Sequence, residues 1–527
     1  FRNAKTAMQL YLYILAVFVT GVLLAYALTP KRFRYLVLLA ASIAANFVYN
    51  HFLGAFILVT SVSVYLCGLG ISALEKKYSP AIKSLPRQER KKPRKKLQRK
   101  KYLVLAAVLI VNLGILFTLK YLNFFADLGV KLIGLFGKEL SAPSFSLVLP
   151  LGISYYTLQA IGYAIDVAGG KYEAERNPAK VALFVCFFPQ QTEGPIGRYN
   201  EMRAELTEGA PLSSENVFRG FLRGFWGLFK ILIVANRFGT IVGEVFGDYA
   251  AYGGMSVVLG ALAFTVQLYA EFSGYIDVAA GVSEVFGIHL KKNFDKPFLS
   301  KDVGEFWRRW HISLGSWFRD YVFFPITASE RALKLQAKDT RGAKTASVLL
   351  VGGGMFAVWF LTGLWHGASV KYIVYGLYYF LLMILHEALK PLFSRLYRAL
   401  KIKEDGIVLS IFRVLKTFAL VTVGMLLFRA DNLFVFGKMF ASVFSGGGAL
   451  NLFAVIDIKD FVVALAGLAA LIVSGILSSC RISLGDKLAK GSLFVRVGAV
   501  ALVVFAVIVF GAYGPGYLPP DPIYGGF

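Results

Sequence analysis

Histidines are the residues of this chain best suited to proton transfer near neutral pH, and two of the five stand in unusual surroundings. His366 ends an almost wholly apolar run that begins at Phe356. A neutral imidazole in a dry setting can accept a proton from a hydroxyl, which is general-base chemistry. Gly363 and Gly367 flank it, and small residues let another backbone or a ligand approach. A structural histidine explains the same residues equally well, so both interpretations stay open at this point.

His311 lies in a run, residues 302–321, that mixes aromatic and basic side chains. If the run is one helix, large apolar residues at three- and four-residue spacing form a stripe, with His311 at its edge. Aromatic residues beside arginines are typical of a helix at the membrane interface, and composition favours this structural interpretation. The stripe contains Phe306, Trp310, Leu314, Trp317 and Tyr321, while Arg308 and Arg319 fall elsewhere on the circumference.

Two carboxylates, Glu271 and Asp277, lie about a turn and a half apart in an otherwise apolar context. Paired carboxylates can do acid–base work, but they can equally form ion pairs with arginines. Arg308, Arg309 and Arg319 are candidate partners, and we favour the structural ion pair.

Residues 188–199 contain prolines and glycines that no regular membrane span would hold together, so we predict a turn or a re-entrant segment. The three cysteines, Cys67, Cys186 and Cys480, show no paired spacing. They predict neither a metal site nor a disulfide framework.

The elements that must position these residues are membrane helices. Of the 527 residues 57% are hydrophobic and only 17% charged, against about 45–50% and roughly a quarter in soluble domains. A spanning helix needs about 20 mostly apolar residues. We predict an all-α polytopic membrane protein with about 11–13 spans, the first at Leu10–Leu28. One membrane domain, 1–527, would hold N-terminal spans (1–142), a distinctive core (143–390) and C-terminal spans (391–527).

The net charge of +26 is unevenly spread, and one stretch, Glu75–Lys101, holds 13 Lys and Arg against two Glu. A nucleic-acid site would need base-stacking groups on a folded basic module, and Tyr78 is the one aromatic residue here. We therefore predict no nucleic-acid partner. The positive-inside rule favours a cytoplasmic loop in contact with anionic lipid headgroups.

Three blocks of residues together resemble the membrane-bound O-acyltransferases, over roughly Leu149–His386. The third block is Leu364–Gly367. The second runs from Phe272–Asp277 through Asn293, Phe294, Pro297 and Phe298 to Phe306–Leu314 and Arg319–Tyr321. The first comprises Leu149–Gln159, Asp166, Phe188–Gln190 and Gly194–Ile196.

The resemblance implies a core of tilted, re-entrant and interfacial helices around a central tunnel through the membrane. It implies that His366 is catalytic and that His311 is the second residue on which the reaction relies. It implies no metal. Further candidates for the substrate path are Trp307, Arg308, Arg309, Trp310, Asp277, Arg319, Trp365 and Gln190.

Within the family, the chain looks most similar to the bacterial branch that acetylates polysaccharides, such as the membrane component of alginate O-acetylation. The resemblance implies a multi-pass protein of the bacterial plasma membrane with no tightly bound cofactor. Acetyl-CoA would be the donor, and an exported polysaccharide or an extracytoplasmic esterase-like partner the acceptor. D-alanyl transfer from a phosphopantetheine carrier protein to teichoic acid is an alternative. A second alternative is a transporter or polymer-export component that catalyses no reaction.

Overall fold

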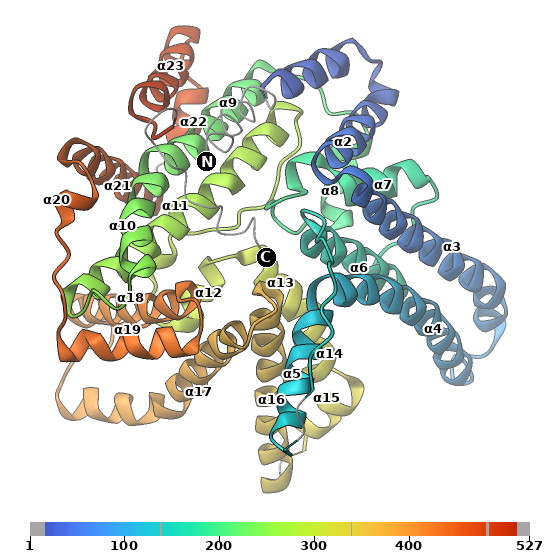
Figure 1. Cartoon of the computed structure of the whole chain (residues 1–527). Coiled ribbons are helices and arrows are strands. Elements are labelled where there is room, and N and C mark those ends of the chain that lie inside the picture. The colour runs from blue at the N-terminus through green and yellow to red at the C-terminus, as the bar shows by residue number, and fades with distance from the viewer. Residues whose placement is uncertain (1–15, 138–139, 339, 481–483, 514–527) are drawn as a thin grey trace. The chain divides into compact units, whose positions relative to one another are not determined.

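The computed structural model describes residues 16–137, 140–338, 340–480 and 484–513, and all regular elements in these ranges are helices (Figure 1). Nine stretches of the described chain are long and apolar enough to cross a membrane, and three shorter apolar helices accompany them. The described residues therefore hold nine candidate spans, fewer than the predicted 11–13, because the three shorter helices do not reach spanning length. The predicted all-α polytopic membrane fold is confirmed. Of the first predicted span the structure describes Ala16–Leu28, and residues 10–15 lie outside the described ranges.

Contacts divide the chain into two compact units, which are described separately. The smaller unit contains Ala16–Asn216 and Ser283–Leu290. Its helices after Ala16–Leu28 are α2 (Arg34–Asn50), α3 (Ala55–Ser84), α4 (Lys91–Leu116), α5 (Leu122–Gly134), α6 (Ile153–Gly169), α7 (Pro178–Cys186) and α8 (Tyr199–Thr207).

The basic stretch Glu75–Lys101 of the smaller unit is mostly helical, whereas the sequence predicted a loop. The helix α3 continues to Ser84 and α4 already begins at Lys91. Lysine and arginine are good helix formers, so both helices extend beyond their apolar parts. Lys101 of α4 pairs with Glu75 of α3 at 2.7 Å and ties the two helices together.

The predicted turn at residues 188–199 is confirmed in the smaller unit. One short turn, η4 (Phe188–Gln190), is followed by irregular backbone up to α8. The Gln190 amide donates to the Pro195 carbonyl at 2.7 Å, so this side chain closes the turn. The Gly197 N–H donates to the side-chain oxygen of Gln159 on α6 at 3.1 Å and fixes the turn to that helix.

The larger unit contains Val217–Val282 and Lys291–Phe527, and both candidate histidines belong to it. Its longest elements are membrane-spanning helices, joined by short helices and turns. They are α9 (Ser214–Phe229), η5 (Lys230–Ala235), α10 (Asn236–Gly247), α11 (Met255–Val285), α12 (Val303–Arg309), α13 (Ile312–Phe318), η7 (Arg319–Phe323), α14 (Phe324–Thr327), α15 (Glu330–Gln336), α16 (Arg341–His366), α17 (Val370–Ala399), α18 (Ile407–Arg429), α19 (Leu433–Ser445), α20 (Leu452–Val455), α21 (Ile458–Ser479), α22 (Leu484–Ala489) and α23 (Leu493–Phe510).

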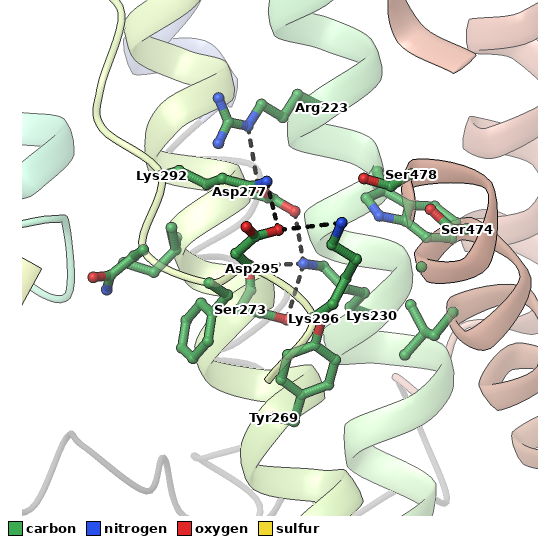
Figure 2. Close-up of a pocket in the computed structure, with 16 residues that line it drawn as sticks. Arg223, Lys230, Tyr269, Ser273, Asp277, Lys292, Asp295, Lys296, Ser474 and Ser478 are labelled. Atoms are coloured by element: carbon green, nitrogen blue, oxygen red, sulfur yellow. Dashed lines mark hydrogen bonds and ion pairs between the residues drawn. The ribbon is translucent and has the colours of Figure 1, made fainter. Parts of the chain in front are cut away.

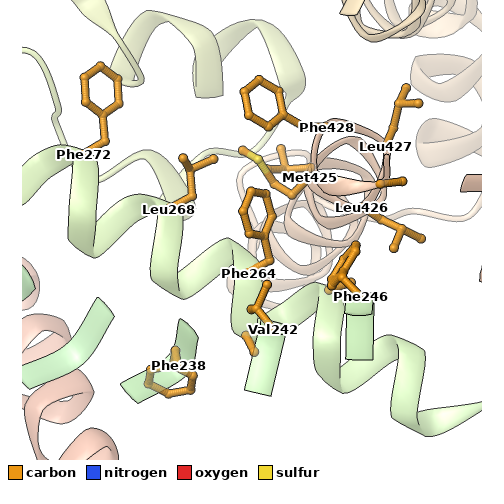
Figure 3. Packing of buried hydrophobic residues seen from close by; sticks show 14 of the residues in the cluster. Phe238, Val242, Phe246, Phe264, Leu268, Phe272, Met425, Leu426, Leu427 and Phe428 are labelled. Atoms are coloured by element: carbon orange, nitrogen blue, oxygen red, sulfur yellow. The ribbon is translucent and has the colours of Figure 1, made fainter. Parts of the chain in front are cut away.

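Aromatic side chains from α10, α11 and α18 form the centre of the larger unit (Figure 3). The ring of Phe264 is fully buried and lies 6.2 Å from that of Phe246 and 6.4 Å from that of Phe428. Phe428 also touches His366, with 5.3 Å between ring centroids. The apolar core therefore reaches directly to a candidate catalytic residue.

Helices α16 and α17 pack as a close hairpin that places His366 at its turn. A Cβ on Gly363 would lie 2.3 Å from the Tyr372 carbonyl oxygen, and one on Gly376 would lie 2.2 Å from the Trp359 carbonyl oxygen. No side chain fits at either position, because such distances are far below van der Waals contact. The close approach predicted for Gly363 is thus a backbone-to-backbone contact.

The single helix considered for residues 302–321 is not present. The run is broken between α12 and α13, where Trp310 is extended and His311 adopts the left-handed conformation with φ 48° and ψ 49°. A side chain in that conformation costs roughly 1–2 kcal/mol, so other contacts must hold it. The segment around Asn293 supplies them: the Asp295 N–H donates to the Arg309 carbonyl at 2.8 Å, and the Ile312 N–H to the Asn293 carbonyl at 3.0 Å.

Candidate active site

Asn293 holds His311 by its side chain as well as by its backbone. The Asn293 Oδ1 accepts a hydrogen bond from the Ser313 N–H at 2.9 Å. The other end of the amide, Nδ2, lies 3.4 Å from the His311 Nδ1. Both side chains are about 1% exposed, so no bulk water competes with these contacts.

This arrangement selects one tautomer of His311. The Ser313 N–H can only donate, so its partner must be the amide oxygen of Asn293. The amide nitrogen therefore faces the imidazole and donates to Nδ1, which must be unprotonated. In neutral His311 the proton then resides on Nε2, and this nitrogen is a hydrogen-bond donor.

Burial keeps His311 neutral. It lies outside the membrane-spanning helices, yet it is fully enclosed, and the loss of solvation lowers its pKa to about 3. Its Nε2 makes no hydrogen bond within the described part of the chain. A buried N–H without a hydrogen bond is costly, and this one can donate to an oxygen atom placed beside it.

The two candidate histidines share one aromatic neighbour, Trp365. The rings of His311 and Trp365 are 5.4 Å apart, and those of Trp365 and His366 are 5.1 Å apart. The centroids of the two imidazole rings are therefore no farther apart than the sum of these two distances. Phe272 packs edge-on to His311 at 4.9 Å, and Tyr375 packs edge-on to His366 at 5.7 Å. His366 is 2% exposed at the last residue of α16.

Two of the predicted substrate-path tryptophans belong to the same aromatic cluster. Trp310 is 2% exposed and lies 5.0 Å from Phe294. Trp307 packs on Trp359 at 4.9 Å. Within the described residues, the buried Nε1 of Trp307 and the buried hydroxyl of Ser313 make no hydrogen bond. Polar atoms thus remain available beside the histidines in an otherwise apolar frame.

The other predicted residues lie in different surroundings. Arg308 is exposed, Arg309 pairs with Glu305 at 2.6 Å, and Arg319 pairs with Asp320 at 3.2 Å. Gln190 belongs to the smaller unit, where it closes the turn described above. Their roles along the substrate path stay predictions.

Asp277 forms the predicted structural ion pair, but its partners differ from the arginines that the sequence offered. The Arg223 Nε donates to it at 3.0 Å, and the Lys230 ammonium donates to it at 2.6 Å. Both partners come from α9 and its continuation η5. The signal was present, because two basic residues seven apart in one apolar run lie on the same helix face.

Glycines let the two helices of this ion pair approach closely. A Cβ on Gly227 of α9 would lie 2.5 Å from the Gly274 carbonyl oxygen of α11, and one on Gly281 would lie 2.5 Å from the Gly220 carbonyl oxygen. Such small-residue seams are common between membrane helices. Among the described residues, no group of three or more His, Cys, Asp or Glu is placed to hold a metal ion.

Comparison with known proteins identifies the family. The profile of the membrane-bound O-acyltransferase family matches residues 175–428, a range that contains every residue of the site described above. A probable alginate O-acetylase of Pseudomonas syringae pv. tomato is 32% identical over 426 residues, which cover 80% of this chain and 72% of that protein.

Two further relatives have other named activities. A peptidoglycan O-acetyltransferase of Helicobacter pylori is 28% identical over 62% of this chain and 61% of its own length. A teichoic acid D-alanyltransferase of Bacillus subtilis is 32% identical over 46% of this chain and 60% of its own length. The extent of the match to the alginate O-acetylase decides the assignment: this multi-pass membrane protein is an O-acyltransferase and belongs to the membrane-bound O-acyltransferase family.

Proposed function

We propose that this chain transfers an acetyl group from cytoplasmic acetyl-CoA, across the bacterial plasma membrane, to a hydroxyl of an exported polysaccharide. The hydroxyl can equally belong to an extracytoplasmic partner transferase that completes the transfer. The observation that carries the proposal is the pairing of His311 and His366 around Trp365. The alginate O-acetylase and the peptidoglycan O-acetyltransferase among the relatives support acetyl as the group and a polysaccharide as the acceptor.

His366 is the general base in this mechanism. It takes the proton of the acceptor hydroxyl as that oxygen attacks the carbonyl carbon of the thioester. The carbon–sulfur bond of the tetrahedral intermediate then breaks, and the imidazolium of His366 returns the proton to the leaving thiolate. Such acid–base catalysis contributes about 10²–10⁴ in rate.

His311 stabilises the charge that develops on the thioester oxygen. Its Nε2–H, fixed by Asn293, donates to this oxygen as it becomes an oxyanion. The donor is neutral and already oriented, so it needs no reorganisation during the reaction. Loss of one such donor costs about 10²–10³ in turnover.

The test uses membranes that contain the chain, labelled acetyl-CoA and the polysaccharide acceptor. His366→Ala should abolish acetyl transfer while leaving expression intact. His289→Ala is the matched control, because this exposed histidine pairs with Glu205 at 3.0 Å in the smaller unit. Normal acetylation by His366→Ala would refute the assignment of the general base.

D-alanyl transfer is the second candidate, favoured by the similarity to the teichoic acid D-alanyltransferase of Bacillus subtilis. The same membranes, incubated with a D-alanyl-charged carrier protein in place of acetyl-CoA, separate the two. Label transfer from the carrier protein alone would replace acetyl by D-alanyl in the proposal and leave the roles of the two histidines unchanged.

A further inference from the structure

A polar cavity of about 190 Å³ lies in the larger unit between α9, α11, α21 and the segment 292–296 (Figure 2). Asn293, whose side chain contacts His311, and Tyr269 belong to its wall. The cavity is smaller than the roughly 300–1,000 Å³ of pockets that enclose whole drug-sized ligands. It fits one polar group and the few atoms attached to it.

The lining of the cavity is rich in positive charge. Four basic side chains face two acidic ones. Lys230 is 5% exposed within a membrane span, where its ammonium donates to the Ser273 hydroxyl at 3.0 Å and to Asp277. Ionisable residues at such positions are costly and mark functional sites. The basic residues are Arg223, Lys230, Lys292 and Lys296, and the acidic ones are Asp277 and Asp295.

Three donors that line the cavity have no strong partner of their own. The Lys296 ammonium approaches Asp295 only at 3.6 Å. The hydroxyls of Ser474 and Ser478 on α21 make no hydrogen bond within the described part of the chain. These serines are one helical turn apart and both line the cavity. An ammonium and two hydroxyls together suit an anion with several acceptor oxygens.

Lys296 is held in a strained conformation at the cavity. Its φ of 52° and ψ of 56° are left-handed, and Pro297 follows it. A residue before proline is further restricted toward extended backbone. Strain of this kind persists where the surroundings enforce it, and it concentrates at ligand-binding sites.

The cavity lies near the basic ends of its helices. The loop before α11 (248–254) and the segment before α21 (446–457) contain no Lys or Arg, whereas 286–302 after α11 contains four and 480–492 after α21 contains three. The positive-inside rule assigns the basic ends to the cytoplasm. Asp277 is eight residues, about 12 Å, from the end of α11. The cavity is therefore at the depth of the cytoplasmic headgroup layer.

We propose that this cavity binds a phosphate group, with Lys296, Ser474 and Ser478 as its ligands. Phosphate provides several acceptor oxygens and a negative charge to match the basic lining. Two sources carry it to this depth from the cytoplasmic side: the headgroup of an anionic phospholipid, and a soluble thioester donor such as coenzyme A. The site itself does not depend on the acetyl-transfer reaction.

The test measures equilibrium binding to the purified full chain in a neutral detergent, without turnover. Each phosphate ligand is paired with a phosphate-free counterpart: coenzyme A with pantetheine, and dioctanoyl phosphatidylglycerol with dioctanoylglycerol. The main variant is Lys296→Gly, because glycine accepts the left-handed backbone and removes only the side chain. The second is Ser474→Ala combined with Ser478→Ala. The control is Lys459→Ala, an exposed lysine at the other end of α21.

At least one phosphate ligand should bind more tightly than its counterpart. Lys296→Gly and the serine variant should weaken that binding roughly ten- to hundredfold, and Lys459→Ala should leave it unchanged. If the variants weaken only the binding of phosphatidylglycerol, the cavity is a lipid site. If they weaken only the binding of coenzyme A, the cavity is a donor site. Equal binding of each phosphate ligand and its counterpart overturns the proposal, as does wild-type affinity in Lys296→Gly. Neither result bears on the roles of His311 and His366.

Discussion

Asn293→Asp tests whether the amide of Asn293 sets the tautomer of His311. The new carboxylate has nearly the same shape and still accepts the Ser313 N–H, so the fold around it is preserved. It cannot donate to Nδ1, however, and it accepts a proton from that nitrogen instead. Neutral His311 then carries its proton on Nδ1, and Nε2 loses its donor.

The size and pH dependence of the effect follow from the structure. Loss of one oriented donor to the developing oxyanion lowers turnover about 10²–10³-fold. A carboxylate beside an imidazole also stabilises the imidazolium and raises the pKa of His311 above its present value of about 3. Below the raised pKa, Nε2 is protonated again and donates. The defect should therefore be largest at alkaline pH and shrink as the pH falls through that pKa.

The assay is the initial rate of acetyl transfer from labelled acetyl-CoA in proteoliposomes, measured from pH 5.5 to 9. The ratio of variant to wild-type rate at each pH removes any titration that the two proteins share. Asn293→Ala is the matched variant: it deprives the Ser313 N–H of its acceptor and leaves His311 without a fixed tautomer. A ratio near one at alkaline pH, or a ratio that does not change with pH, would refute the tautomer argument.

Three further predictions concern stability, each measured as a midpoint of thermal unfolding in detergent. Gly281→Ala should destabilise the protein by about 1–3 kcal/mol because the new Cβ meets backbone atoms at 2.5 Å. Gly353→Ala, whose Cβ enters open space, should leave the stability unchanged. Equal midpoints for the two variants would contradict the close packing of α9 and α11. Asp277→Asn should cost about 3–5 kcal/mol because it leaves the buried ammonium of Lys230 without its carboxylate. The exposed Asp127→Asn should cost under ~1 kcal/mol. Because the pKa of His311 is about 3 folded and about 6.5 unfolded, the unfolded chain binds the extra proton between these values. Stability should therefore fall as pH falls from 6.5 to 3, and His311→Gln should show less of this loss.

Much of the fold was predictable because it depends on local properties of the sequence. Apolar runs of spanning length predict helices, and the prolines and glycines of 188–199 predict a turn. The position of His366 at the end of a span was also predictable. Each of these follows from residues near one another in the chain, where composition and period carry the information.

The missed features depend on partners that are distant in sequence. Asp277 pairs with Arg223 and Lys230, 54 and 47 residues away, and no local pattern around Asp277 identifies them. The break at His311 is similar. The residues of 302–321 keep a helical period through the break, so periodicity predicts one helix. The segment that interrupts it, around Asn293, is 18 residues upstream.

The same break gives His311 the position on which its proposed role depends. A helix interior uses all of its backbone donors and acceptors, and irregular backbone near membrane depth needs partners from the protein itself. Asn293 and Asp295 supply these partners to residues 309–313, and the interruption turns the imidazole away from the helical path. His366 is likewise at a helix end, the last residue of α16. Both imidazoles are thus placed by helix termination, and the segment around Asn293 shapes the candidate active site together with the two histidines.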